Sequence, residues 1–336
     1  MKNNDSLSRE NKPSIVVIGG GTGTYTVLFG LKKLNKDLTA IVTMMDSGGS
    51  SGRLRDEFGV LPPGDIRQSL VALSGDASIL RKLFDYRYVK GESLQGHSFG
   101  NLFLTALADI TGGMDKAIIE ASKVLNIKGK VLPVTTDQAH LLAKYENGLE
   151  VKGEGNIDEP KHDGKLRIKE LILEPKPKAY PQALEAIEKA DFIVLGPGDL
   201  YTSIIPNLLV PGVASAICKA SAKKVYIVNL MTKYGQTFGF KASDHVITLE
   251  KYLGENCLDY VFINSTRLPT DILERYEKEG DYPVKDDLKK DGFKVIRGNF
   301  LASEPIKKPQ GDVLKRSLIR HDSNKLAKKI MEIVGS

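Results

Sequence analysis

A buried strand followed by a glycine turn constrains the fold of this chain more than any other feature. Residues 14–33 read SIVVIGGGTGTYTVLFGLKK. The apolar, β-branched run Ser14–Ile18 predicts a strand that is buried on both faces of a sheet. Apolar residues at helical spacing in Tyr25–Leu34 predict a helix whose N-terminus points free N–H groups at an anion. The stretch therefore predicts a strand, a turn and a helix that together can hold a phosphate group.

The glycine turn leaves more than one ligand open. Gly20, Gly21 and Gly23 let the backbone approach a ligand closely, and Thr22 adds a hydroxyl donor. The full dinucleotide fingerprint requires a further glycine where this chain has Thr26. We expect a phosphate-binding turn of some kind; a purely structural turn is the alternative.

The order of predicted elements indicates the fold class. Short buried runs alternate with amphipathic segments, which is typical of a Rossmann-like, doubly wound α/β fold with a mostly parallel sheet. The predicted strands are Ser14–Ile18, Leu38–Met44, Val131–Val134, Phe192–Leu195, Lys224–Asn229, Tyr260–Asn264 and Phe293–Ile296.

One stretch, at about residues 136–176, departs from this alternation. Asn147-Gly148 lies between two alternating runs and predicts a hairpin with a type I′ turn. Leu166–Leu173 predicts a third strand. We therefore expect a small antiparallel β insertion within a single Rossmann-like domain of residues 14–336. A polar, disordered tail of residues 1–13 precedes this domain in the prediction.

Composition favours a small anionic ligand. The net charge of +6 is spread along 336 residues without a basic and aromatic stripe, so we do not expect nucleic-acid binding. No membrane span or targeting segment is evident, so we expect a soluble, cytoplasmic protein. Cys218 and Cys257 have no metal-like spacing, and this cysteine usage is typical of a reducing compartment.

A second donor-rich loop follows the second predicted strand. The sequence MMDSGGSSGRLR places Asp46 where a dinucleotide site has its ribose-binding acid. Ser50 and Ser51 then lie in a flexible loop whose successive N–H groups form an anion nest. Arg53 adds a two-pronged group for phosphate. A disordered surface loop is the alternative interpretation.

Further candidate ligand contacts come from the rest of the chain. Gly196 and Gly198 form a second glycine turn after a buried strand, and ligands of open α/β sheets bind beyond such strand ends. Both glycine turns are therefore expected to face one cleft. The remaining candidates are Asn101 at a helix start, Asn229 for a base or sugar, Tyr276 for stacking and Arg320 for a diphosphate. Packing is the alternative role for the tyrosine, and a surface ion pair is the alternative for the arginine.

Taken together, the motifs resemble those of a known family. IGGGTGTYTVLFGLK, DSGGSSGRLR, PPGDIR, GHSFGNL, SKVLNIKGKVLPVT, GPGDLYTSIIPNLLVPG and RHD occur in this order. The chain resembles the bacterial gluconeogenesis factors, the nucleotide-sugar-binding branch of the 2-phospho-L-lactate transferase superfamily. The resemblance extends from Ser14 to the last predicted helix.

The resemblance implies a function. It implies binding of a nucleotide sugar of the UDP-N-acetylglucosamine type and a regulatory role in gluconeogenic growth, cell-wall synthesis and cell shape. It leaves room for a regulatory protein partner in cell-wall precursor synthesis and for a homodimer. The positions that match the family's motifs are Gly20, Gly21, Thr22, Gly23, Asp46, Asn101, Tyr276 and Arg320.

Two positions depart from the family pattern. Many members have a second acid where this chain has Ser47, which weakens a two-carboxylate Mg²⁺ site. Asp199 stands where serine commonly follows the second glycine turn, and its carboxylate would repel a phosphate unless a cation intervenes. The alternative function is a magnesium-dependent 2-phospho-L-lactate-type transferase, in which Asp46 holds the metal. A nicotinamide oxidoreductase is disfavoured by Thr26 and the second donor-rich loop.

Overall fold

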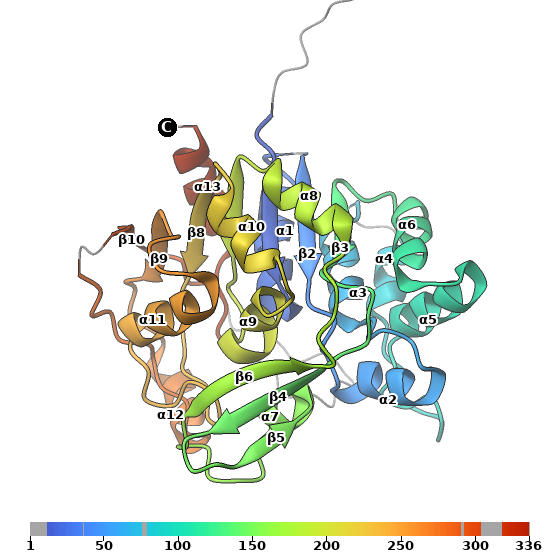
Figure 1. Cartoon of the computed structure of the whole chain (residues 1–336), viewed down its shortest axis with the longest axis horizontal. Helices are drawn as coiled ribbons and strands as arrows, with labels where there is room; N and C mark the ends of the chain where they lie inside the picture. Colours follow the sequence, from blue (N-terminus) through green and yellow to red (C-terminus); the bar gives the residue numbers. More distant parts are fainter. Residues whose placement is uncertain (1–11, 36, 76–78, 290–291, 304–317, 336) are drawn as a thin grey trace, which may run out of the picture.

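The central feature of the computed structural model is a seven-stranded parallel sheet. The structure describes residues 12–35, 37–75, 79–289, 292–303 and 318–335. The strand order of the sheet is β10-β9-β8-β7-β1-β2-β3 (Figure 1). The strands are β1 (Ile15–Gly19), β2 (Leu38–Val42), β3 (Lys130–Pro133), β7 (Phe192–Leu195), β8 (Lys223–Ile227), β9 (Tyr260–Asn264) and β10 (Lys294–Gly298). All seven predicted strands are therefore confirmed, and so is the doubly wound, mostly parallel fold.

Helices cover both faces of this sheet (Figure 1). On one face lie α1 (Gly21–Leu31), α3 (Gly64–Leu73) and α13 (Ser323–Val334). On the other lie α8 (Pro181–Glu188), α9 (Ile205–Leu208), α10 (Val213–Lys219) and α11 (Ala242–Leu253). The helices beside the β3 edge are α4 (Ile79–Asp85), α5 (Phe99–Thr111) and α6 (Met114–Val124). Because both faces are covered, every residue of β1, β2 and β7 is buried, as the continuous apolar run predicted for β1.

The strand order reverses its direction between β1 and β7. The chain first runs from β1 outward to β2 and β3, and then returns to β7, which pairs with the opposite side of β1. From β7 it continues outward through β8, β9 and β10. In open α/β sheets, ligands bind at the carboxyl ends of the strands beside such a reversal. The fold therefore points to the loops after β1 and β7.

A three-stranded antiparallel sheet lies beyond these carboxyl ends (Figure 1). It consists of β4 (His140–Tyr145), β5 (Glu150–Lys152) and β6 (Ile168–Glu174), with the short helix α7 (Glu154–Asp158) after β5. These strands fall inside the predicted β insertion. The predicted type I′ turn is wrong, because Gly148 has a φ of 87° whereas Asn147 does not have positive φ. The amide of Gly148 bonds to the carbonyl of Tyr145, so the left-handed glycine follows the turn instead of forming half of it.

The loop predicted after β2 is also wrong in part, because Gly49–Phe58 form helix α2. The glycines and serines of this segment suggested a flexible loop, but tertiary contacts override their low helix propensity. A Cβ atom on Gly52 would lie 2.1 Å from the Ser47 carbonyl oxygen, so only glycine permits this close approach. Ser50 and Ser51 are buried against neighbouring helices.

The two cysteines are paired, which the sequence did not predict. A disulfide joins Cys218, on α10, to Cys257, with their Cα atoms 5.2 Å apart. Disulfides are typical of oxidising compartments, so the cysteines do not support the expected reducing one. In the part of the chain that the structure describes, no single helix has the length and apolarity to cross a membrane; only the bent pair Leu200–Leu208 and Val213–Lys219 does, by length and composition alone.

Candidate functional site

The two glycine turns contact each other at the strand-order reversal. A Cβ atom on Gly23, in α1, would lie 1.8 Å from the carbonyl oxygen of Pro197 in the second turn. A Cβ atom on Gly198 would lie 3.6 Å from the carbonyl oxygen of Gly20. Gly196 has a φ of 75°, a backbone conformation that glycine adopts without strain. The two glycine-tipped strand ends therefore adjoin, whereas the cleft that both turns were expected to face stays a prediction. Part of the glycine content serves this mutual packing.

A carboxylate stands at the start of α1, where the sequence suggested a phosphate. Asp65, in the first turn of α3, accepts a hydrogen bond from the amide of Gly21 at 2.8 Å. A Cβ atom on Gly20 would lie 2.3 Å from the other oxygen of Asp65. Thr22 is half-buried at the same turn. An anion is thus stabilised at this helix N-terminus, and the anion is the chain's own.

Side chains from the strand ends fix the second glycine turn. The Asn229 side-chain oxygen, after β8, accepts a hydrogen bond from the amide of Gly198 at 3.2 Å. Asp199 directly precedes the π-helix Leu200–Ile204, and its carboxylate pairs with the Lys233 ammonium at 2.7 Å. A phosphate can bind near Asp199 only if a cation offsets the charge of this carboxylate. The Lys233 ammonium is such a cation.

Three predicted ligand contacts come together at the start of α2. The Asn101 side-chain nitrogen donates to the Ser50 hydroxyl at 3.2 Å and lies 3.5 Å from that of Ser51. Ser50 also bonds to Nδ1 of His97 at 2.9 Å, while Arg67 donates to the Asn101 oxygen at 3.0 Å. The pKa of His97 is lowered by burial and by nearby arginines, which favours the neutral ring. This buried network fixes the amide, both hydroxyls and the start of α2 in place.

Arg53 is placed differently from the other predicted contacts. Its guanidinium is exposed and donates to the Gln95 carbonyl at 2.9 Å, in the loop before His97. The neighbouring Arg55 is buried instead and donates to the Ala139 carbonyl at 2.7 Å. Of the two arginines, the buried one anchors the segment that enters the β insertion.

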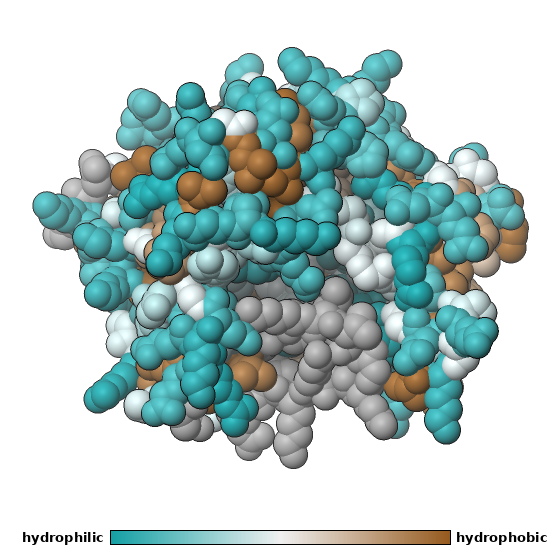
Figure 2. Space-filling model, turned by 90° about the horizontal axis from the view of Figure 1, so that it is seen from below, coloured by the Kyte–Doolittle hydropathy of each residue, from teal (hydrophilic) through white to brown (hydrophobic). Residues whose placement is uncertain are grey.

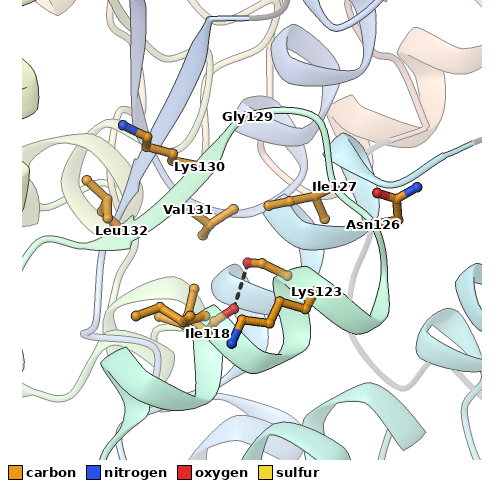
Figure 3. A pocket seen from close by; sticks show the side chains of 10 residues that line it. Ile118, Lys123, Asn126, Ile127, Gly129, Lys130, Val131 and Leu132 are labelled. Atoms are coloured by element: carbon orange, nitrogen blue, oxygen red, sulfur yellow. Dashed lines mark hydrogen bonds between the residues drawn. The ribbon is translucent and has the colours of Figure 1, made fainter.

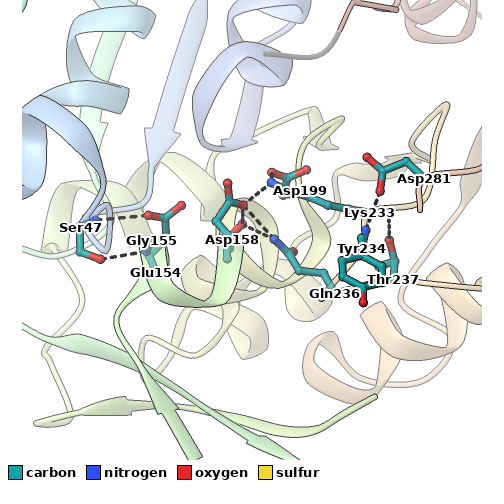
Figure 4. A network of polar contacts seen from close by, with 12 residues as sticks. Ser47, Glu154, Gly155, Asp158, Asp199, Lys233, Tyr234, Gln236, Thr237 and Asp281 are labelled. Carbon is teal, nitrogen blue, oxygen red and sulfur yellow. Dashed lines mark hydrogen bonds and ion pairs between the residues drawn. The ribbon is translucent and has the colours of Figure 1, made fainter. Parts of the chain in front are cut away.

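Helix α7 brings carboxylates to the site that the sequence analysis did not single out. The Glu154 carboxylate accepts from the Ser47 amide at 3.3 Å, and the Ser47 hydroxyl accepts from the Gly155 amide at 3.0 Å (Figure 4). Asp46 is half-buried beside them and accepts from the Gly48 amide at 2.9 Å. Burial, reinforced by Asp46 and Asp158, raises the pKa of Glu154 well above its ordinary value. A second acid therefore does approach Ser47, from a segment distant in sequence.

The other end of α7 is tied to the main sheet through Lys233. Its ammonium pairs with Asp158 as well as Asp199, and Gln236 donates to Asp158 at 2.9 Å (Figure 4). Burial alone would lower the pKa of Lys233, but the two carboxylates outweigh it and the pKa is raised. Lys233 and Gln236 flank Gly235 in the sequence MTKYGQT, which lies in the loop after the buried strand β8. That position at a strand end was the available signal for them.

Tyr276 belongs to a small second core. It lies on α12 (Thr270–Lys278), is 7% exposed, and packs with Leu230 and Ile319. Its hydroxyl accepts hydrogen bonds from the amides of Leu318 and Ile319 at 2.7 and 3.1 Å. These bonds hold the segment that carries Arg320 in place. The Arg320 carbonyl oxygen also accepts a hydrogen bond from the Ala302 amide at 3.0 Å. The structure shows a packing role for Tyr276, and ligand contacts at both positions stay predictions.

A Tyr276→Phe variant is expected to lose about 1–3 kcal/mol of unfolding free energy, because two backbone amides lose their acceptor. Urea unfolding of the variant and the wild type measures this difference. Tyr282→Phe, on a tyrosine that is 42% exposed, is the matched control and should change stability little. Equal losses in both variants would show that the Tyr276 hydroxyl does not hold the segment.

An apolar cavity elsewhere is a poor candidate for this chemistry. A cavity of about 440 Å³ lies between α6 and β3, at the sheet edge away from the glycine turns (Figure 3). Its lining is mostly apolar and includes Ile118, Ile127, Val131 and Leu132. Charged and donor groups gather instead at the carboxyl edge, whose surface is mostly hydrophilic over its described part (Figure 2). Among the described residues, no group of three or more His, Cys, Asp or Glu side chains could hold a metal ion.

Comparisons with known proteins show the family of this chain. The profile of the family 2-phospho-L-lactate transferase CofD matches residues 15–301. The chain belongs to this family. A Bacillus subtilis relative named gluconeogenesis factor is 43% identical over 327 residues, covering 96% of this chain and 98% of the relative. A Halalkalibacterium halodurans relative of the same name is 44% identical over 325 residues, covering 96% of each.

A solved structure supports the same assignment. The crystal structure of a UPF0052 family protein from Bacillus halodurans superposes with a TM-score of 0.87 at 41% identity. The superposition covers 95% of this chain and 99% of the chain in that crystal structure. The resemblance to the bacterial gluconeogenesis factors is therefore confirmed over nearly the whole length.

Proposed function

We propose that this family member binds a nucleotide sugar of the UDP-N-acetylglucosamine type and acts as a cytoplasmic regulatory factor for gluconeogenic growth, cell-wall synthesis and cell shape. The observation that carries the proposal is the contact between the two glycine turns at the strand-order reversal. The relatives named gluconeogenesis factor support the part that concerns gluconeogenic growth. A regulatory protein partner and a homodimer stay predictions.

The turns carry backbone amides of the kind that bind a diphosphate, although Asp65 and Asn229 now accept hydrogen bonds from those of Gly21 and Gly198, which a ligand would have to displace. The amides after β1 and β7 lie at the ends of two paired, fully buried strands, so their positions are rigid. Asn229 holds the second turn from β8, and Asn101 holds the start of α2 from the opposite side of the site. Rigid, preorganised donors reduce the entropy lost when an anion binds.

The charge of the site sets a condition on binding. Asp46, Asp65 and Asp199 lie at the carboxyl edge, and α7 adds Glu154 and Asp158. Lys233 pairs with two of these carboxylates, so it does not neutralise the others. A diphosphate would meet this negative charge unless a cation or proton uptake by the acids offsets it. We therefore expect affinity to increase with Mg²⁺.

The position of Glu154 favours a second candidate function, a magnesium-dependent transferase of the 2-phospho-L-lactate type. A Cβ atom on Gly48 would lie 3.6 Å from an Asp46 oxygen and 3.7 Å from a Glu154 oxygen. Two carboxylates are ligands of the kind that Mg²⁺ prefers, with water completing its shell. Asp46 and Glu154 would hold the ion, which would supply charge neutralisation of a diphosphate, while the glycine turns position the substrate.

Calorimetric titration separates these functions. The ligands are UDP-N-acetylglucosamine, a guanosine diphosphate and NADH, each with and without Mg²⁺. The proposal predicts micromolar binding of the uridine ligand, tightened by Mg²⁺, with no turnover. Metal-dependent cleavage of a diphosphate conjugate would establish the transferase instead. Absence of uridine-ligand binding under both conditions would refute the first proposal.

A further inference from the structure

Lys233 and Gln236 converge on one carboxylate of the β insertion. The Lys233 ammonium forms an ion pair with Asp158, and the Gln236 side-chain nitrogen donates to the same oxygen at 2.9 Å (Figure 4). The Thr202 hydroxyl lies 3.5 Å from that oxygen. An ammonium and an amide donor aimed at one anionic oxygen are also the groups that bind a phosphate oxygen.

The contact joins the β insertion to the main sheet, in addition to hydrogen bonds elsewhere between them such as that from the Leu171 amide to the Tyr252 hydroxyl. Asp158 ends α7 in the insertion, whereas Lys233 and Gln236 follow β8 of the main sheet. The opposite end of α7 rests on Ser47, after β2, through Glu154 and the Gly155 amide. Helix α7 therefore spans the carboxyl edge from the β2 side to the β8 side, held by polar contacts at each end.

The Asp158 contact is open to exchange with a dissolved anion. The Lys233 and Asp158 side chains are partly exposed, by 26% and 30%. Burial and the nearby Asp199 raise the pKa of Asp158, although the Lys233 ammonium opposes this shift. Lys233 keeps a second partner, Asp199, after Asp158 leaves. Replacement of Asp158 by a phosphate group thus leaves no buried cation unpaired.

We propose that Lys233 and Gln236 form an anion-binding position and that Asp158 occupies it as an internal competitor, so that an entering phosphate group displaces Asp158 and frees α7. The inference rests on the proposed function, because it assigns these residues to the phosphates of the same ligand. Ligand binding then changes how the insertion is held, which links the site to the surface that the insertion presents.

The test compares variants of the full chain by calorimetric titration with inorganic pyrophosphate in the presence of Mg²⁺. Asp158→Asn removes the competing charge and is expected to raise affinity about tenfold, whereas Lys233→Met should weaken it about tenfold or more. Lys144→Met is the matched control, because Lys144 pairs with Glu150 and Glu170 within the insertion. Its affinity should equal that of the wild type. If Lys233→Met does not fold, Lys233→Arg takes its place in the test. It keeps the positive charge and should retain pyrophosphate binding.

Hydrogen exchange of residues 153–158 gives the second measurement. Pyrophosphate should speed exchange of these amides in the wild type, and Asp158→Asn should show faster exchange without ligand. Unchanged or weakened affinity in Asp158→Asn, or slower exchange on binding, would overturn the inference.

Titration of the same variants with UDP-N-acetylglucosamine separates this inference from the proposed function. Uridine-ligand binding that survives Lys233→Met unchanged would refute the inference and leave the proposed function standing. Pyrophosphate binding with the expected variant effects, but no uridine-ligand binding, would refute the proposed function and leave the inference standing. If the wild type binds neither ligand, both are wrong.

Discussion

A Gly23→Ala variant is expected to lose about 3 kcal/mol of unfolding free energy, the upper end for inserting one methyl group into a packed site. The added Cβ would lie 1.8 Å from the Pro197 carbonyl oxygen and 2.4 Å from its carbon. Both atoms belong to backbone, so no side-chain rotation can relieve the overlap. The two glycine turns must separate, and the variant should also lose measurable affinity for UDP-N-acetylglucosamine.

Two matched variants separate the effect of Gly23→Ala on folding stability from its effect on ligand affinity. Gly30→Ala, on the same helix, would place its Cβ 2.0 Å from the Ser323 carbonyl oxygen of the adjoining segment and should destabilise comparably. It lies where α1 packs on α13, so ligand affinity should survive at temperatures where the chain is folded. Gly75→Ala meets no atom within 4 Å and should be nearly neutral. Wild-type ligand affinity in Gly23→Ala would contradict the role of the contact between the turns.

Acidification from pH 7 to pH 4 is expected to remove up to about 3 kcal/mol of unfolding free energy through His245 alone. His245, on α11, is fully buried, and burial lowers its pKa to about 4 from an ordinary value of 6.5. His321 is buried, and its pKa is also lowered to about 4. Above pH 6.5 both rings are neutral in the folded and unfolded chain. As pH falls from 6.5 to 4, only the unfolded chain takes up these protons, so stability is lost.

Comparison of variants isolates this contribution from other titrating groups. The raised pKa of Glu154 acts in the opposite direction, because the folded chain then takes up the proton first. The wild type and His245→Gln are therefore unfolded with urea at several pH values between 4 and 7. The stability difference between them should shrink by about 3 kcal/mol as pH falls. Parallel pH profiles would show that the buried ring does not carry the effect.

The strands of the sheet could be predicted from sequence because their local composition indicates that they are buried. Runs such as Ile15–Gly19 consist of consecutive apolar residues, which is the pattern of a strand covered on both faces. Helix α2 could not be predicted this way, since Gly49, Ser50, Ser51 and Gly52 favour turns in isolation. Their helix depends on contacts with Asn101 and Ser47, which local sequence does not contain.

The candidate site was predicted where a motif follows a strand and missed where partners are distant. Both glycine turns, Asp46 and Asn229 lie at the carboxyl edge as expected from their strand ends. The pairing of Lys233 with Asp158, by contrast, joins residues 75 positions apart. No local pattern indicates which carboxylate of the insertion reaches across the main sheet. The same holds for Asp65, which bonds to an amide 44 residues away.

The most direct test of this account is a crystal structure of the protein with UDP-N-acetylglucosamine and Mg²⁺. We expect the pyrophosphate at the junction of β1 and β7, within hydrogen-bond distance of amides in the turns that contain Gly21 and Gly198. A pyrophosphate bound at any other part of the surface, with Asp65 and Asp158 keeping all their present contacts, would contradict it.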